Sequence, residues 1–199
     1  MSSNKQHQST LIESFVASFE KLDEMLVVDE HLDVIGWQLA FSEPDQYGFK
    51  SWRPIKVETP ANALEAIYAK LPARFPRLYE KLVLTYRWEQ VDLQRCRLLA
   101  NPPGDGLTGL LEQMSKDPAL WNTLRAAGYI QFAKGPDIDY DPVCFDLSAR
   151  KKNGDCRIVK IDHEEILCNN RLKVVSEVAQ VFDDLMRRTI EIASASNRS

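Results

Sequence analysis

The residues of this sequence that could carry out chemistry gather around a single histidine. His163 stands between Asp162 on one side and the pair Glu164 and Glu165 on the other. An imidazole beside carboxylates is the combination that general acid–base catalysis or a metal site requires. Both functions also need groups that converge on one point, and neighbours on a strand point to opposite faces. A structural or partner-binding role is therefore favoured over catalysis by a small hydrolase or metal enzyme.

A second group of carboxylates precedes the histidine by about twenty residues. Asp137, Asp139 and Asp141 alternate with other residue types in a short segment that follows Gly135-Pro136. A calcium loop would need more oxygen ligands and a glutamate at a fixed spacing, which this segment lacks. Loop carboxylates in contact with water are the simplest interpretation, and contact with a basic protein surface is the second.

Other chemical motifs do not assemble in this chain. Cys144, Cys156 and Cys168 could join His163 in a zinc site, but zinc ligands come in closely spaced pairs and no Cys-x-x-Cys is present. These cysteines are more typical of buried strand residues. The sequence also lacks a Gly-x-Ser-x-Gly elbow, a Walker loop and a dinucleotide fingerprint. It predicts neither a cofactor nor a metal ion.

Tryptophan is the remaining candidate for a partner contact. Trp37, Trp52, Trp88 and Trp121 are spread over different predicted elements, and most are expected in the core. Trp52 is the exception to test, because it adjoins Arg53 on a predicted edge strand, and binding hot spots favour these two residue types. Packing in the core remains the simpler role for Trp52.

Two strands must position the carboxylates and the histidine. Residues 143–148 alternate between apolar and polar or small side chains, the pattern of a half-buried strand. Residues 158–161 form a second, β-branched run, and Asn153-Gly154 between the two runs favours a turn. We therefore expect a β-hairpin that ends at Asp162, where residues 162–165 lie at the strand end or in the next turn.

The rest of the chain predicts an α+β domain with helices on one face of a mainly antiparallel sheet that is centred on this hairpin. A capping box at Thr10 and Glu13 favours a first helix over residues 9–27, and the last helix is expected to include Val174, Val178, Phe182 and Leu185. We expect an N-terminal extension (1–58), a core (59–193) and a disordered tail (194–199). The other expected helices cover 59–72, 107–114 and 117–127 and one that starts at 76, and the other expected strands cover 34–41, 49–57, 96–100 and 129–133.

The order of these parts resembles the SUKH superfamily, named for Syd, US-type viral proteins and Smi/Knr cell-wall regulators. Members often carry Phe-Asp-Leu at the end of a strand, here residues 145–147, and Asp-His-Glu after its hairpin partner, here residues 162–164. A closing helix with an apolar-Phe-x-x-Leu pattern follows, here residues 181–185. The opening Leu-Pro and Tyr segment of many members is similar to residues 71–79.

The resemblance implies a SUKH-like fold and a non-enzymatic, protein-binding function. Many bacterial members are immunity proteins that neutralise toxins, often nucleases, and eukaryotic members are regulatory scaffolds. The implied contact is an acidic surface that docks on a basic partner, and charge complementarity of this kind mainly accelerates association. Its residues would be Asp137, Asp139, Asp141, Asp146, Asp162, His163, Glu164 and Glu165, with Trp52 as a separate anchor.

Composition agrees with this class of function. The chain has 199 residues, 44% of them hydrophobic, and a formal net charge of −4. An acidic protein is a poor direct ligand for nucleic acid but can cover a basic protein. The polar start and the lack of a run of about 18 apolar residues predict a cytoplasmic protein without a membrane segment, in which the cysteines stay reduced. Nothing in the sequence indicates an oligomeric state.

Overall fold

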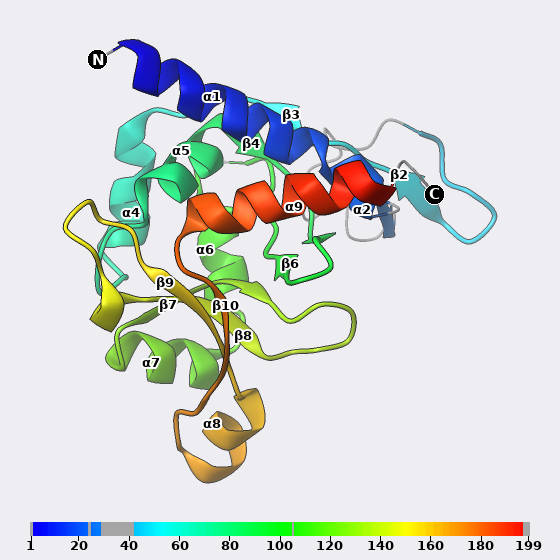
Figure 1. Cartoon of the computed structure of the whole chain (residues 1–199). Coiled ribbons are helices and arrows are strands. Elements are labelled where there is room, and N and C mark those ends of the chain that lie inside the picture. Colours follow the sequence, from blue (N-terminus) through cyan, green and yellow to red (C-terminus); the bar gives the residue numbers. More distant parts are fainter. Residues whose placement is uncertain (1, 24, 29–41, 105, 197–199) are drawn as a thin grey trace.

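A six-stranded antiparallel sheet forms the centre of the molecule. The computed structural model describes residues 2–23, 25–28, 42–104 and 106–196. Each strand of the sheet lies beside its neighbours in the chain, in the order β10-β9-β8-β7-β6-β5 (Figure 1). The strands are β5 (Val91–Asp92), β6 (Arg97–Leu98), β7 (Tyr129–Lys134), β8 (Pro142–Asp146), β9 (Arg157–Ile161) and β10 (Val174–Ala179). The predicted α+β class with an antiparallel sheet is confirmed.

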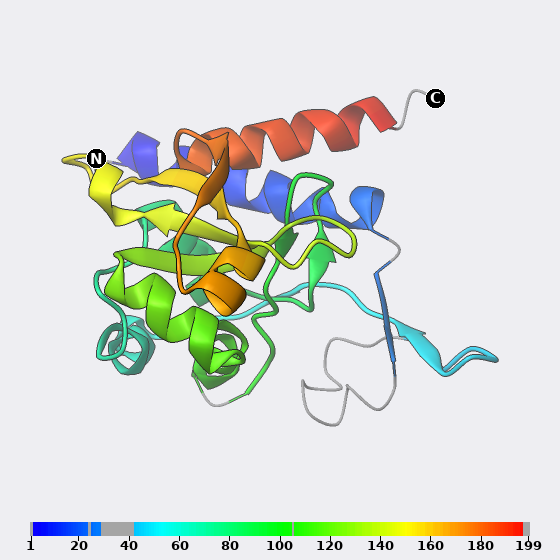
Figure 2. The same cartoon turned by 90° about the horizontal axis from the view of Figure 1, so that it is seen from below.

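Helices pack on this sheet from both sides. Helices α1 and α9 lie along one side of it and α7 lies along the other (Figure 2). The sequence predicted helices on one face, and the structure adds α7 and α8 on the second. The helices are α1 (Ser2–Ala17), α2 (Phe19–Leu22), α4 (Glu65–Tyr68), α5 (Arg77–Thr85), α6 (Thr108–Ser115), α7 (Pro118–Ala126), α8 (His163–Asn169) and α9 (Phe182–Ser196), with 3₁₀ helices η2 (Ala61–Leu64) and η3 (Leu147–Ala149).

An aromatic cluster joins the sheet to the helices of its first face. The rings of Phe132 in β7 and Phe145 in β8 are stacked, with their centroids 4.2 Å apart. Tyr79 from α5 and Phe182 from α9 contact both rings in edge-on geometry. Phe15 from α1 meets Phe182 in the same way, so α1 belongs to the same core as the residues after position 59. Large aromatic side chains in such arrangements stabilise the folded state by more than the burial of their area alone.

The predicted hairpin is present as β8 and β9, with Phe145 opposite Ile158 and Cys144 opposite Val159. Alternation sends the first pair to the large core and the second pair to a smaller core against α7 and α8. Strand β8 is therefore buried on both faces, whereas the alternation of its sequence indicated a half-buried strand. The small Cys144 fits under the short helices that cover the second face.

The C-terminal helix begins later than predicted. Residues 174–179 form the edge strand β10, in which Val174 pairs with Ile161, and α9 starts at Phe182. Valines spaced by four residues fit a helical stripe, but β-branched residues also suit a strand, and the unpaired edge of β9 supplies the hydrogen bonds. Helix α9 continues to Ser196, so residues 194–196 of the expected disordered tail are helical.

The N-terminal region also differs from the prediction. Helix α1 spans residues 2–17, so Thr10 lies inside it and donates a hydrogen bond to the carbonyl of Gln6 instead of capping its start. The end of the predicted first helix is instead β1 (Leu26–Val28), which pairs with β2 (Phe49–Ser51). The predicted strand at 34–41, with Trp37, lies outside the described residues.

The predicted strand over residues 49–57 is broken in two around Pro54. Its second part, β3 (Ile55–Lys56), pairs with β4 (Tyr86–Arg87) in a separate two-stranded sheet. Proline has no N–H to donate to a ladder, which explains the break. Elsewhere β6, β7, α6 and α7 lie within a few residues of the predicted positions, and Asp117 caps α7 by accepting from the amides of Ala119 and Leu120.

Candidate functional site

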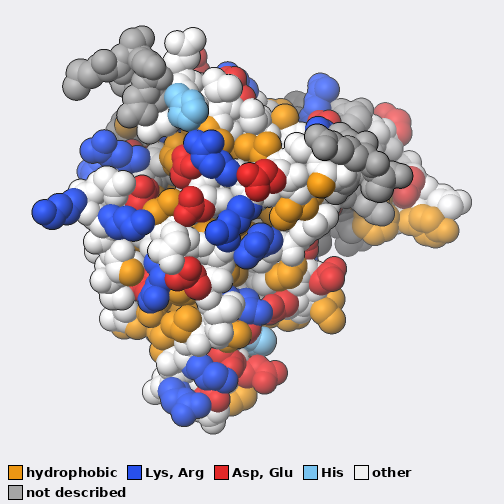
Figure 3. Space-filling view, viewed as in Figure 1, with side chains coloured by type: hydrophobic (Ala, Val, Ile, Leu, Met, Phe, Trp, Pro, Cys, Tyr) orange, Lys and Arg blue, Asp and Glu red, His pale blue; other side chains and the backbone are white. Residues whose placement is uncertain are grey.

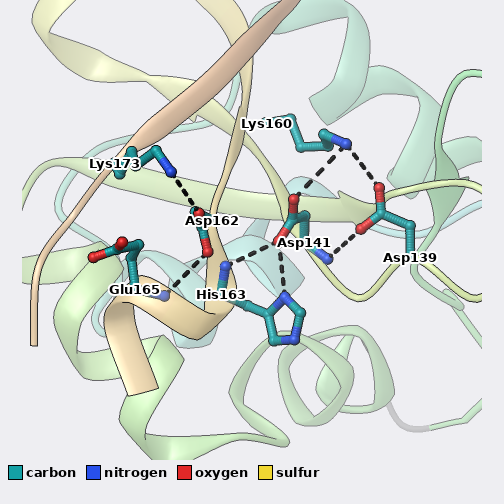
Figure 4. A network of polar contacts seen from close by, with 7 residues as sticks. All are labelled: Asp139, Asp141, Lys160, Asp162, His163, Glu165 and Lys173. Carbon is teal, nitrogen blue, oxygen red and sulfur yellow. Dashed lines mark hydrogen bonds and ion pairs between the residues drawn. The ribbon is translucent and has the colours of Figure 1, made fainter. Parts of the chain in front are cut away.

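The predicted carboxylates and the histidine come together from two segments that are distant in the sequence (Figure 4). One is the loop between β7 and β8, residues 135–141, and the other is the start of α8. One carboxylate oxygen of Asp141 accepts from the backbone N–H of His163 at 2.9 Å and lies 2.8 Å from its ring Nδ1. Asp139 pairs with Lys160 of β9 at 2.8 Å, and Lys160 also lies 3.7 Å from Asp141. The loop is thereby tied to both β9 and α8.

Close packing inside the loop fixes the position of Asp139. A Cβ atom at Gly135 would overlap the Asp139 side chain, so this position requires glycine. Burial alone would raise the pKa of Asp139, but hydrogen bonds from Lys160 and from the amide of Asp141 outweigh it and lower the pKa. Asp139 is therefore an ionised, internally paired residue.

Asp162 acts as the N-cap of α8. Its side chain accepts from the amide of Glu165 at 3.0 Å and pairs with Lys173 at 3.0 Å, and both interactions lower its pKa. Glu165 pairs with Arg171 at 3.0 Å. The chain becomes helical at His163, directly after the end of β9, so residues 162–165 lie at the strand end and in the first helical turn. Carboxylates in a first helical turn complement the free amides and the helix dipole, which explains this acidic sequence structurally.

Two predicted partner-binding residues are buried. Only 1% of Asp146 is exposed, and its carboxylate pairs with Arg157 at 2.6 Å and accepts from the amide and hydroxyl of Ser148. Trp52 is also 1% exposed and packs in the large core. Its prediction as an exposed anchor is wrong, because the indole packs against the other residues of the large core. Neither side chain is available to a partner.

The predicted acidic surface is therefore largely neutralised from within. Asp139, Asp141, Asp162 and Glu165 each face a cationic or hydrogen-bonding side chain from the same molecule. Asp137 and Glu164 remain as exposed carboxylates. Figure 3 shows basic and acidic side chains mixed over the visible face, without a continuous acidic area.

Apolar side chains protrude where carboxylates were expected to. Ile138 is 86% exposed and Tyr140 60% exposed, both on the β7–β8 loop, and Leu167 of α8 is 49% exposed. We call these three residues the apolar tip. These three residues were not predicted as contacts, although acidic and apolar residues alternate over 137–141. Asp139 and Asp141 turn inward to their partners, and Ile138 and Tyr140, which alternate with them, turn outward.

A cleft of about 500 Å³ opens beside the apolar tip, between α6, α7, β7 and α8. Lys134, Tyr140 and His163 line it, with the Lys134 ammonium 5.7 Å from the centre of the Tyr140 ring and the Tyr140 and His163 rings 6.3 Å apart. The Asp141–His163 contact resembles the orienting half of a general-base arrangement. The described residues that line the cleft include no Ser, Thr or Cys, so the hydroxyl or thiol nucleophile of a catalytic triad is missing from its wall.

The cysteines do not complete a metal site. Cys144 and Cys156 are buried, as expected of structural cysteines, but Cys168 is exposed on α8. Within the described ranges, no group of three His, Cys, Asp or Glu side chains is arranged to hold a metal ion.

Comparison with known proteins adds no assignment. No protein-family model matches the chain, and no curated protein matches it with significant sequence similarity. The resemblance to the SUKH superfamily therefore stays a prediction from motifs. Every helix in the described part of the chain is too short or too polar to traverse a lipid bilayer.

Proposed function

We propose that this protein is a non-enzymatic protein-binding domain that meets its partner through the apolar tip. The observation that carries the proposal is the exposure of Ile138 and Tyr140 on one loop and of Leu167, which lines the same cleft as Tyr140. Apolar surface in water is unfavourable by about 25 cal/mol per Å², and large exposed apolar groups mark interaction sites. Tyrosine is also among the residues that contribute most to binding hot spots.

The internal carboxylates support this proposal by holding the tip in place. Asp139 and Asp141 link the loop to Lys160 and His163, so little conformational freedom is left to lose when a partner binds. The carboxylates that the sequence suggested as contacts thus act as positioning groups. The two exposed ones, Asp137 and Glu164, form a charged rim that suits a partner with basic residues around an apolar contact.

We propose neutralisation of a cognate toxin as the biological form of this binding, in line with the SUKH resemblance. A regulatory scaffold is the alternative form. A toxin domain encoded beside this gene would be the partner to test first. Rescue of cell growth when both proteins are produced together would support the immunity role, whereas binding without rescue would favour the scaffold.

The test of the binding surface compares two exposed tyrosines. Tyr140→Ala removes the ring of the apolar tip, and Tyr47→Ala removes a 74% exposed ring on the separate β1–β2 arm. Measured by surface plasmon resonance, Tyr140→Ala should weaken partner binding by about tenfold or more, and Tyr47→Ala by less than about twofold. Equal affinities for both variants would contradict the proposed surface. Asp137→Lys and Glu164→Lys should mainly slow association.

A hydrolase built on His163 is the second candidate, and the Asp141–His163 contact at 2.8 Å favours it. With Nδ1 held by the carboxylate, the other ring nitrogen could activate a water molecule in the cleft. Purified protein and His163→Ala should then differ in hydrolysis of a panel of small esters and phosphoesters. Equal background rates for the two proteins would contradict the hydrolase, and protein binding would be the one proposed function that remains.

A further inference from the structure

The cleft beside the apolar tip has a charge opposite to that expected for this region. Lys116 and Lys134 line it, and neither forms an ion pair with any carboxylate of the described residues. Asp117 also lines the cleft, but one of its oxygens accepts hydrogen bonds from the amides of Ala119 and Leu120 at the start of α7. Positive charge in the cleft is therefore compensated only in part.

Lys134 shows the consequence of this imbalance. It is half-buried at the end of β7, and burial lowers its pKa. The positive charges of Lys116 and Arg97 lower this pKa further. Asp117 acts in the opposite direction, and the Tyr140 ring below the ammonium offsets a further part of the cost. A half-buried ammonium without a carboxylate at ion-pair distance is unfavourable, and an anion bound beside it would relieve that cost.

The remaining wall of the cleft is apolar. Met114 of α6, Leu120 of α7 and Leu167 of α8 line it together with the Tyr140 ring. Its volume of about 500 Å³ lies in the range of small-molecule sites, which combine apolar walls with a few polar groups. His163 stands at the edge of this wall, and its Nε2 has no hydrogen-bond partner among the described residues.

We propose that this cleft binds a small organic acid, in which a carboxylate contacts Lys134 and Lys116 and an apolar or aromatic body lies against Met114, Leu120 and Leu167. The inference goes beyond the protein-binding function and shares Tyr140 and Leu167 with the apolar tip, but its test concerns a ligand that the isolated chain takes up without a protein partner. Lys134 supplies the short-range ion pair, and Lys116, which is exposed, adds a longer-range attraction.

The test uses 3-phenylpropionate as the probe and its neutral amide, 3-phenylpropionamide, as the matched control. Titration of the isotope-labelled full chain is followed by NMR, through the His163 ring signals and the amides of Lys134 and Leu167. The acid should shift these signals saturably with a Kd of about 1 mM, as expected for a ligand of this size. The amide should bind at least about tenfold more weakly, because it cannot pair with the lysines.

Variants separate a built site from general attraction to lysines. Lys134→Gln should weaken binding of the acid about tenfold. Lys116→Gln should weaken it about threefold, because the ion pair between Lys116 and the ligand carboxylate is more exposed to solvent. Lys152→Gln, at an exposed lysine in the β8–β9 loop, should leave the Kd unchanged. The NMR spectrum of the backbone amides shows whether each variant keeps the fold. If Lys134→Gln does not fold, Lys116→Gln still tests the site. Equal binding of acid and amide, no saturable shift, or equal Kd values for all three variants would overturn the proposal.

Discussion

One oxygen of Asp141 holds both the backbone N–H and the ring Nδ1 of His163, at 2.9 and 2.8 Å. The two residues are 22 positions apart, and the contact joins the β7–β8 loop to the first turn of α8. It places Tyr140 and His163 on the same cleft, so the geometry of the apolar tip depends on this carboxylate.

Removal of this carboxylate should loosen the loop. We expect Asp141→Ala to lower the free energy of unfolding by about 1–3 kcal/mol, because the backbone N–H and the ring Nδ1 of His163 lose their partner and Lys160 keeps only Asp139 as a counter-ion among the described residues. Urea denaturation measures this change, and Glu164→Ala, at an exposed carboxylate of the same helix, is the control and should cost only a few tenths of that. A loss no larger than the control would show that the contact is not stabilising.

The pair of Asp146 and Arg157 should stabilise the hairpin above acidic pH. Burial would raise the pKa of Asp146, but hydrogen bonds from Ser148 and Arg157 outweigh it and lower the pKa below the ordinary range. A lowered pKa in the folded state gives stability that is present above the pKa of an unfolded aspartate, about 3.9, and is lost as the pH falls through the folded value.

Asp146→Asn should therefore be less stable than the wild type at neutral pH by about 2 kcal/mol, with the difference shrinking toward pH 3. Unfolding in urea at several pH values gives both curves. A difference that is independent of pH would mean that the charge of Asp146 contributes nothing beyond its shape.

Glu89 should have the opposite effect on stability. It is 6% exposed, its Oε1 has no hydrogen-bond partner among the described residues, and burial raises its pKa to about 7. Between the unfolded pKa of 4.5 and this value the folded state binds more protons than the unfolded state, so stability falls as the pH rises. The loss is on the order of 3 kcal/mol by pH 8.

Glu89→Gln isolates this effect, because its side chain has nearly the same shape and does not ionise. Thermal or urea unfolding between pH 5 and pH 8 should show a decline for the wild type that is reduced in Glu89→Gln. Parallel curves for the two proteins would contradict the raised pKa.

The cysteines should differ sharply in reactivity. Cys168 is exposed on α8, whereas Cys96, Cys144 and Cys156 are buried, and burial raises the pKa of Cys96 to about 12. Thiolates are the reactive form, so an aromatic disulfide reagent at pH 8 should titrate one thiol rapidly in the native protein and all four after denaturation. Cys168→Ser should abolish the fast phase; more than one fast thiol would show that a buried cysteine becomes accessible in the native protein.

Local patterns predicted those elements whose partners are adjacent in the chain. The β8–β9 hairpin, α7 with its Asp117 cap, and α5 after Pro76 follow from alternation, capping and proline chemistry, all of which act over a few residues. The prediction that the last helix includes residues 174–179 was wrong, because the valines at 174 and 178 fit the periodicity of a helix as well as that of a strand. Only the free edge of β9, an element from elsewhere in the chain, selects the strand.

The site shows the same division more clearly. The sequence by itself determined the α+β class, the hairpin, and the clustering of Asp, His and Glu beside a turn. Tertiary structure alone decided what these side chains do, because an ion pair depends on which cation folding brings within about 4 Å, and burial depends on what covers the second face of the sheet. Lys160 and Lys173 pair with Asp139 and Asp162, and burial removes Asp146 and Trp52 from the surface. Ile138 and Tyr140 remain exposed.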